Sequence, residues 1–315
     1  MEVCTDTPPD DRDTSCAEWA AYGECENPNG WLDAFCDLSC GRCSIMSTSD
    51  GSGGSNTTGD ATNTNSNTNS STTGSLGNDN PYPPIQGGTN GFATRYWDCC
   101  KPSCGWAGNA NPVVVSCDRN DENRSANDTQ NACEANGQSG AFTCHSMAPW
   151  AYSNVVSYGF AAVNGVSCGT CFQIEFPGSS QRGGNDPGSA ALAGKTMVVM
   201  ATNIGGIEQN QFDLLIPGGG VGLLNGCSGQ WGVDNSELGA QYGGFLTNCR
   251  QANPENHEGV KSCVRERCEA VFGSRGLTEL YDGCMWFVDW FEAADNPDIR
   301  FQQISCPSDL TSVAY

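Results

Sequence analysis

The sequence predicts a mainly β protein, and three observations lead to that expectation. The 315 residues include 40 glycines, Asn, Ser and Thr are abundant, and the apolar runs are short. Short apolar runs separated by turn-forming residues are typical of strands joined by loops. A hydrophobic content of 37% is enough for a core in at least part of the chain.

Composition divides the chain into three parts. Residues 1–43 form a cysteine-dense head, residues 44–91 a stretch rich in Ser, Thr, Asn and Gly, and residues 92–315 a larger body. The middle stretch lacks the apolar residues of a core and is typical of a flexible linker. The head is too short for a hydrophobic core to fold it unaided, so we expect its six cysteines to form three disulfides.

Within the body, strands and one helix are predicted from local patterns. Short β-branched and aromatic runs predict strands at residues 173–176, 196–204, 212–217 and 285–291. Apolar residues at helical spacing predict a helix over residues 258–272. The glycines of PGGGVG at 217–222 predict a turn with positive φ angles. That turn lacks the GK[ST] ending of a phosphate-binding loop, which argues against a nucleotide site.

Cysteine usage indicates an oxidising compartment. Twenty cysteines with only two histidines favour disulfides over zinc ligation. Sequons at Asn56, Asn69, Asn123 and Asn127 agree with a secreted, extracellular glycoprotein. The start, MEVCTDTPPDD, has no apolar segment of the signal-peptide type. Either the signal has been removed or the precursor is longer.

The charge and hydropathy of the chain limit its partners. The formal net charge of -22 would repel nucleic acid and anionic membrane surfaces, so a neutral partner fits better. No run reaches the roughly 20 apolar residues of a membrane span. We therefore expect no nucleic-acid or membrane partner, and a monomer.

Two aspartates stand out as chemical groups. Asp98 lies among aromatic residues and cysteines in ATRYWDCCKPSC at 93–104, and Asp213 lies in NQFDLLIPGGG before three glycines. Two fixed carboxyl groups indicate a general acid and a general base.

Several long motifs in this body resemble glycoside hydrolase family 45, a group of endoglucanases that cut β-1,4-glucan with inversion. They are TRYWDCCKPSCGW at 94–106, FDLLIPGGGVGLLNGC, YGG and FVDWFEAADNP. The resemblance implies a six-stranded double-psi β-barrel with long disulfide-stapled loops. By the same motifs Asp98 corresponds to the general base and Asp213 to the general acid.

Further site residues follow from the resemblance. Tyr96 matches a position under the sugar ring and Trp106 an aromatic residue lining the groove, where flat rings stack on pyranose faces. We expect Trp97 in the core. Thr94 and Arg95 are expected to orient the segment, with Arg95 the partner of a nearby carboxylate.

The chain departs from the family pattern at a third carboxylate. Family members often carry Gly-Gly-Asp on a mobile loop, whereas this chain reads Gly-Gly-Ile-Glu at 205–208. Glu208 is either an auxiliary acid that tunes Asp213 by like-charge proximity or an exposed loop residue.

The resemblance also implies disulfides in the body. The implied pairs are Cys99–Cys227, Cys100–Cys133, Cys104–Cys168, Cys117–Cys144 and Cys171–Cys306. Four cysteines remain, namely Cys249, Cys263, Cys268 and Cys284. Cys263 and Cys268 point to different faces of a helix, so they are not expected to pair with each other. The other two connectivities stay open.

The head resembles the ShK-type toxin domain through SCAEWAAYGEC and WLDAFCDLSCGRC. That resemblance implies two short helices and the pairs Cys4–Cys43, Cys16–Cys36 and Cys25–Cys40. Channel blockers of this family use an exposed lysine, and this head has none. We expect an accessory module instead.

The activity expected of the whole chain is an endo-1,4-β-D-glucanase (cellulase) that needs no cofactor or metal. The main alternative is a non-hydrolytic polysaccharide-loosening protein of the expansin type, which shares the barrel but lacks the segment bearing Asp98. A lectin-like binder with a decayed site is a third. Cellulose, mixed-linkage glucan and glucomannan present the same local β-1,4 backbone, so the preferred glucan is left open.

Overall fold

The computed structural model describes residues 77–122, 129–181 and 186–315. The Cys-rich head, its three expected disulfides and all four sequons lie outside these residues. The description below therefore concerns the body and the last part of the stretch that precedes it.

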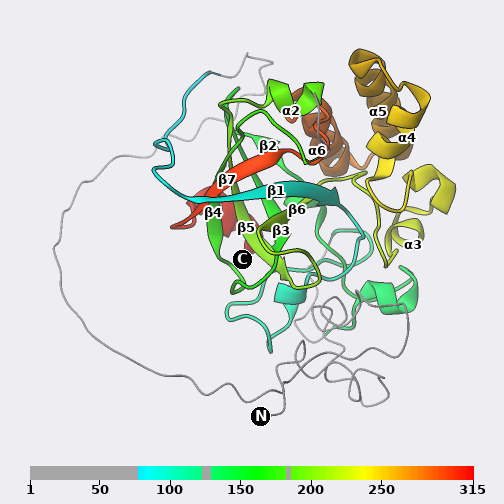
Figure 1. The fold of residues 1–315 in the computed structure, drawn as a ribbon. Coiled ribbons are helices and arrows are strands. Elements are labelled where there is room, and N and C mark those ends of the chain that lie inside the picture. Colours follow the sequence, from blue (N-terminus) through cyan, green and yellow to red (C-terminus); the bar gives the residue numbers. More distant parts are fainter. Residues whose placement is uncertain (1–76, 123–128, 182–185) are drawn as a thin grey trace, which may run out of the picture.

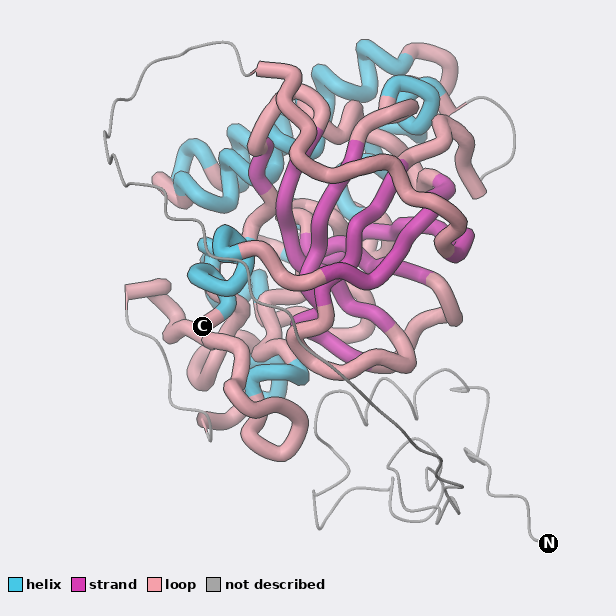
Figure 2. The backbone as a smooth tube through the Cα atoms, turned by 90° about the vertical axis from the view of Figure 1, so that its left-hand side faces the viewer, coloured by secondary structure: helices cyan, strands magenta, loops and turns pink. Residues whose placement is uncertain are grey.

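Six strands form a closed barrel (Figures 1 and 2). They are β1 (Thr89–Tyr96), β3 (Val156–Val163), β4 (Cys171–Glu175), β5 (Thr196–Ile204), β6 (Gln211–Leu215) and β7 (Asp298–Ile304). The order around the barrel is β3-β5-β4-β7-β1-β6, and pairing of β3 with β6 closes the ring. A two-residue strand, β2 (Trp150–Ala151), pairs with β3 outside the ring. The predicted mainly β, six-stranded barrel is confirmed.

Three of the predicted strands are barrel strands. β5 has the predicted bounds, and β4 and β6 lie within two residues of theirs. Every residue of β3 is buried, as are the first eight of β5. Such continuous burial explains why these runs are apolar rather than alternating.

The predicted strand at 285–291 is wrong, because most of this run lies in helix α6 (Thr278–Asp289). Leu280, Cys284 and Phe287 recur at helical spacing on its buried side. An aromatic run of this length fits either a buried strand or a buried helix face, and tertiary packing decided for the helix.

The predicted helix at 258–272 is confirmed as α5 (His257–Val271). It packs beside α4 (Gly244–Ala252) and α6, and α3, α4 and α5 lie together on one side of the barrel (Figure 1). Disulfides join Cys249 to Cys263 and Cys268 to Cys284. The connectivity that the sequence left open is thus resolved, with α5 bonded to both α4 and α6.

The remaining five disulfides of the described residues have the pairing that the family resemblance implied. Three of them start within the short segment from Cys99 to Cys104. Cross-links of this kind restrict the unfolded chain and fix the local backbone. The segment after β1 is therefore held by covalent bonds although it has little regular structure.

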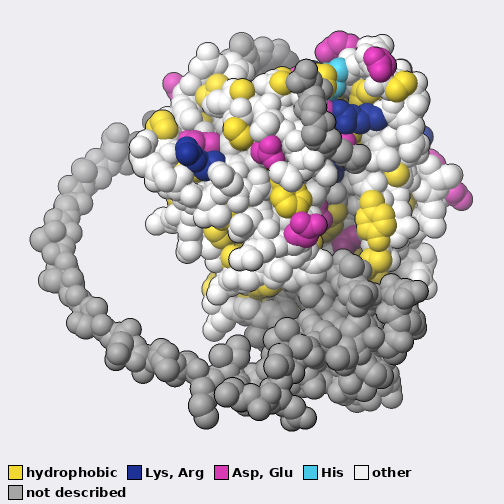
Figure 3. All heavy atoms as spheres, in the orientation of Figure 1, with side chains coloured by type: hydrophobic (Ala, Val, Ile, Leu, Met, Phe, Trp, Pro, Cys, Tyr) yellow, Lys and Arg dark blue, Asp and Glu magenta, His cyan; other side chains and the backbone are white. Residues whose placement is uncertain are grey.

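Short helices complete the fold. They are α2 (Pro187–Ala191), α3 (Cys227–Trp231), α7 (Ser308–Ala314) and the 3-10 turns Ser103–Gly105, Ala132–Ala135, His145–Met147, Asn235–Leu238 and Gly273–Arg275. Within the described residues, no helix has the length and apolar character needed to cross a bilayer. Acidic side chains outnumber basic ones on the face in Figure 3.

The stretch just before β1 lies against the barrel. The Tyr82 and Tyr158 hydroxyls are 2.9 Å apart, and Gln173 donates to the Pro83 carbonyl at 2.8 Å. Ile85 is buried, and its N–H donates to Glu175. Packing against the body thus begins upstream of β1, within residues whose composition resembles a linker.

Phe272 packs within the layer formed by α3, α4 and α5, so the loss of its ring should lower the stability of the protein. It is fully buried at the end of α5 and packs edge-on against Trp231, with ring centroids 5.0 Å apart. We expect Phe272→Ala to lower the free energy of unfolding by about 3–5 kcal/mol, because a cavity remains where the ring was. Denaturant unfolding measures this, with Tyr152→Ala on the surface as the control. Equal stability of the two variants would contradict the packing.

Candidate active site

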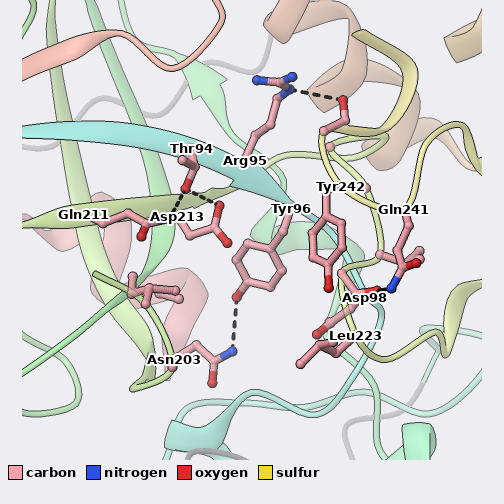
Figure 4. A pocket seen from close by; sticks show the side chains of 18 of the residues that line it. Thr94, Arg95, Tyr96, Asp98, Asn203, Gln211, Asp213, Leu223, Gln241 and Tyr242 are labelled. Carbon is pink, nitrogen blue, oxygen red and sulfur yellow. Dashed lines mark hydrogen bonds between the residues drawn. The ribbon is translucent and has the colours of Figure 1, made fainter. Parts of the chain in front are cut away.

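The pairing of β1 with β6 brings the sequence-predicted residues into one cleft. The two strands are parallel, and Thr94 stands opposite Asp213 in the register. Because strand side chains alternate, Thr94 and Tyr96 point to the same side of β1. They line a cavity of about 280 Å³ together with Arg95, Asp98 and Asp213. Figure 4 shows the side chains in this cleft.

Asp213 has the electrostatics of an acid. Thr94 Oγ1 donates to Asp213 Oδ1 at 2.7 Å, and Gln211 Nε2 donates to the same Thr94 oxygen at 2.7 Å. Burial raises the pKa of Asp213 to about 7, and the Asp98 charge adds to this. The Thr94 hydrogen bond and the Arg95 charge act in the opposite direction. Desolvation of the carboxylate therefore outweighs its stabilising partners.

Asp98 is held by the backbone around it. Its side chain is buried, and Oδ1 accepts the N–H of Cys100 at 2.9 Å. Its carbonyl accepts the N–H of Gly226 at 2.9 Å. Cys99 has a left-handed φ of 64°, which turns the chain just after Asp98. The disulfide to Cys227 fixes this turn, so the carboxyl group stays directed at the cleft.

Tyr96 lies between the two carboxyl groups in Figure 4. Burial raises the pKa of its phenol well above the usual value, and the charges of Asp98 and Asp213 add to this. Asn203 Nδ2 donates to the Tyr96 hydroxyl at 3.3 Å, and Asn203 Oδ1 accepts the N–H of Ser103 at 2.9 Å. Because the amide oxygen is thus occupied, its NH₂ group is turned toward Tyr96, and the tyrosine ring has a fixed position.

Arg95 has the carboxylate partner that the sequence led us to expect. Its Nη1 lies 2.9 Å from Asp295 Oδ1, and its Nε donates to the Gly243 carbonyl at 3.3 Å. Asn296 Oδ1 accepts a further bond from Nη1 at 3.3 Å. The guanidinium is consequently fixed at the edge of the cleft.

Three residues that were considered from the sequence do not line the cleft, namely Trp97, Trp106 and Glu208. Trp97 is almost fully buried, as expected of a core residue. Trp106 does not line the cavity, and the Lys101 ammonium lies 3.7 Å from the centre of its ring. Glu208 is exposed on the loop between β5 and β6 and does not line the cavity either. Its N–H donates to the side chain of Gln211 at 2.9 Å.

Some cleft residues were not singled out from the sequence. Asn203 and Gln211 hold Tyr96 and Thr94, while Leu223 and Tyr242 line the cavity and expose large apolar surfaces. Tyr242 and Asn296 lie within the quoted YGG and ADNP motifs, which was an available signal. Gly220 has a φ of 106°, and an added Cβ would lie 2.7 Å from the Gln241 carbonyl. The glycine turn therefore lets the two loops of the cleft meet closely.

Metal ligation has little support among the described residues. One cluster there has suitable spacing, Cys117 with Asp121 and Cys144. The two sulfurs form a disulfide, so neither is the thiolate that binds metals.

The fold and cleft together define a class of protein. A pair of carboxyl groups in one open cleft, one of them with its pKa raised to about 7, is the kind of arrangement that glycoside hydrolases use. The comparison with known proteins agrees, because residues 90–314 match the model of glycosyl hydrolase family 45. The chain belongs to this family. Residues 3–43 match the ShK domain-like model, as the head motifs led us to expect.

Curated relatives carry endoglucanase names. Endoglucanase B of Cellvibrio japonicus (strain Ueda107) is 53% identical over 237 residues, which are 73% of this chain and 46% of that protein. A putative endoglucanase type K of Fusarium oxysporum is 38% identical, over 71% of this chain and 52% of its own length. The chain thus spans about half the length of these two relatives.

A solved structure has the same fold. It is the cellulase of the Antarctic springtail Cryptopygus antarcticus, with a TM-score of 0.57 and 34% sequence identity. The match covers 73% of this chain and 97% of the springtail chain.

The hydrogen bond from Thr94 makes a testable contribution to the acidity of Asp213. It stabilises the ionised carboxyl, so Thr94→Val should raise the pKa of Asp213 above 7, by about 1 unit. Carboxyl ¹³C NMR titration measures the shift directly. Thr311→Val on α7, at the molecular surface, is the matched control. A pKa that stays at the wild-type value in Thr94→Val would show that the bond does not favour the charged form.

Proposed function

We propose that this protein is a secreted endo-β-1,4-glucanase that hydrolyses internal bonds of cellulose and related glucans with inversion. The observation that carries the proposal is the presence of two carboxyl groups in one cleft, Asp98 and Asp213. Burial raises the pKa of Asp213 to about 7, so this group can hold a proton near neutral pH. Endoglucanase names among the relatives support the substrate class.

The two carboxyl groups have different tasks. Protonated Asp213 donates its proton to the glycosidic oxygen as the bond to the anomeric carbon breaks. Ionised Asp98 takes a proton from a water that attacks the opposite face of that carbon. Such a mechanism needs carboxyl groups roughly 6.5–9.5 Å apart, so that the water fits between sugar and base.

The aromatic and polar residues of the cleft bind the sugar. Tyr96, fixed by Asn203, offers a flat face below the reacting ring. Thr94 orients the acid through its hydrogen bond, and the Arg95 charge acts on the acid electrostatically. Tyr242 is 63% exposed beside the same cavity, where its ring can stack on a further glucosyl unit. Trp106 does not line this cavity, so its expected contact with the substrate stays a prediction.

The pH dependence follows from the acid. Asp213 is active only while protonated, so kcat should fall as pH rises through about 7. The same group makes folding depend on pH. Its pKa is higher in the folded than in the unfolded state, so its contribution to stability is present at low pH and is lost as pH rises from about 4 to about 7.

The domain organisation and oligomeric state of the protein are also proposed from the sequence. We propose a monomer with an accessory head at 1–43, a linker from 44 and a catalytic body that requires no cofactor or metal. The seven disulfides of the described residues suit an extracellular protein. An expansin-like loosening protein is the alternative. The buried Asp98 in the cleft favours the hydrolase.

The assignment of acid and base is tested by Asp213→Asn and Asp98→Asn. Each substitution keeps the shape but removes one proton transfer, so kcat on soluble β-1,4-glucan should fall by about 10²–10⁴-fold. Wild-type products should carry the inverted anomeric configuration by ¹H NMR. Asp289→Asn, on the surface of α6, is the control and should keep full activity. Swelling of cellulose without new reducing ends would support the expansin alternative.

The role of Glu208 is tested separately. It is exposed and does not line the cavity, so Glu208→Gln should change kcat less than about 3-fold. Initial rates on soluble glucan measure this. A loss comparable to that of Asp213→Asn would mean that the loop closes over substrate and that Glu208 is the third carboxylate of the site.

A further inference from the structure

A chain of four charged side chains extends from the cleft into the protein. Arg95 of β1 pairs with Asp295 at 2.9 Å, and Arg250 of α4 contacts the other oxygen of Asp295 at 2.6 Å. The second terminal nitrogen of Arg250 pairs with Asp186, the N-cap residue of α2. Residues from four distant parts of the sequence thus alternate in charge along one line of contacts.

The two carboxylates of this chain are buried and have defined partners. Asp295 is 2% exposed and Asp186 is 7% exposed. Asp186 Oδ2 accepts the N–H of Asp295 at 3.0 Å, along with the N–H and hydroxyl of Ser189. Buried carboxylates are tolerated only when they are paired and hydrogen-bonded, and both conditions hold here. The arrangement therefore fixes the position of each charge.

The outer end of the chain acts on Asp213. Arg95 lines the cleft, as do Gly243 and Asn296, the partners of its guanidinium. The Arg95 charge opposes the rise in the pKa of Asp213. The other groups that influence this carboxyl are the Asp98 charge and the Thr94 hydroxyl, while the Tyr96 phenol shares the cleft. Arg95 is the one positively charged group among them. The pKa of Asp213 therefore depends on how far the Arg95 charge is neutralised by its own partners.

We infer that Asp295 is a positioning residue for the reaction: it fixes the Arg95 guanidinium at the edge of the cleft that Asp213 lines and neutralises part of its charge, with Arg250 holding Asp295 in turn. This inference rests on the proposed role of Asp213 as the acid. It gives a function to a buried charge cluster that touches neither substrate nor reacting atoms.

The inference predicts that the pKa of Asp213 shifts in opposite directions when Asp295 or Arg250 is replaced. In Asp295→Asn the Arg95 charge is less neutralised, so the pKa of Asp213 falls. Arg95 keeps its bonds to Gly243 and Asn296 in that variant. In Arg250→Gln a positive charge is lost while Asp295 remains, so the pKa of Asp213 rises. Each shift should be about 0.5–1 pH unit at the effective dielectric of a protein interior.

The experiment uses the full chain with ¹³C-labelled aspartate carboxyls. The Asp213 resonance is assigned from its absence in Asp213→Asn and is titrated in wild type, Asp295→Asn and Arg250→Gln. The alkaline limb of kcat is measured on the same proteins. Asp289→Asn removes one partner of the exposed Arg265–Asp289 pair and should leave both quantities unchanged. Arg250→Lys should restore a pKa close to that of wild type.

The outcomes separate a charge effect from a structural one. Opposite shifts of the Asp213 pKa support the inference. An unchanged pKa, or shifts of the same sign, would overturn it, because a merely structural role lowers stability in both variants without that pattern. If Asp295→Asn does not fold, Arg250→Gln still decides, since its side chain is partly exposed and the pKa must rise.

The inference can also be distinguished from the proposed function. If Asp213→Asn stays active while the titrations shift as expected, the network is real and the acid is another group. If Asp213→Asn is inactive and the titrations do not shift, the acid is correct and the network inference fails.

Discussion

The parallel pairing of β1 with β6 is the constraint on which the site depends. It sets Thr94 opposite Asp213, joins them by a 2.7 Å hydrogen bond and leads directly to the segment that carries Asp98. A slip of one residue would turn Asp213 away from the cleft, because side chains alternate along a strand. β6 also pairs with β3 to close the barrel. The interaction that orients Asp213, the proposed acid, and the one that completes the fold therefore belong to the same strand.

Beyond the end of β1, covalent bonds replace regular structure. Asp98 is followed by Cys99 in a left-handed conformation and by two further half-cystines within six residues. Loops that carry functional residues are usually mobile, and a reacting group must be held within a fraction of an ångström. Three disulfides to separate regions meet that requirement while leaving the cleft open to a polymer.

Much of this could be predicted from sequence, and the failures have physical reasons. The β-branched run at 196–204 indicated a strand, and the structure has one there. The aromatic run at 285–291 fitted a buried strand and a buried helix equally well, and most of it is helical. Motifs indicated Asp98 and Asp213, and charge alone indicated a carboxylate partner for Arg95. The partner is Asp295, 200 residues away, and only folding brings the two together. Asn203 and Gln211 act by orienting neighbours, which leaves no pattern in composition or spacing.

The Arg95 charge at the edge of the cleft is consistent with the two states that Asp213 would occupy as the proposed acid. In the proposed mechanism the carboxyl holds a proton near neutral pH before the bond breaks, which burial and the Asp98 charge favour. After donation the same group is an anion in a poorly solvated cleft, where Thr94 and Arg95 stabilise it. An Arg95 charge that no carboxylate neutralised would lower the pKa of Asp213 further and favour its ionised form before the glycosidic bond breaks. Under the inference drawn above, Asp295 neutralises part of the Arg95 charge. The proposed acid can then lose its proton in the reaction and regain one from water afterwards.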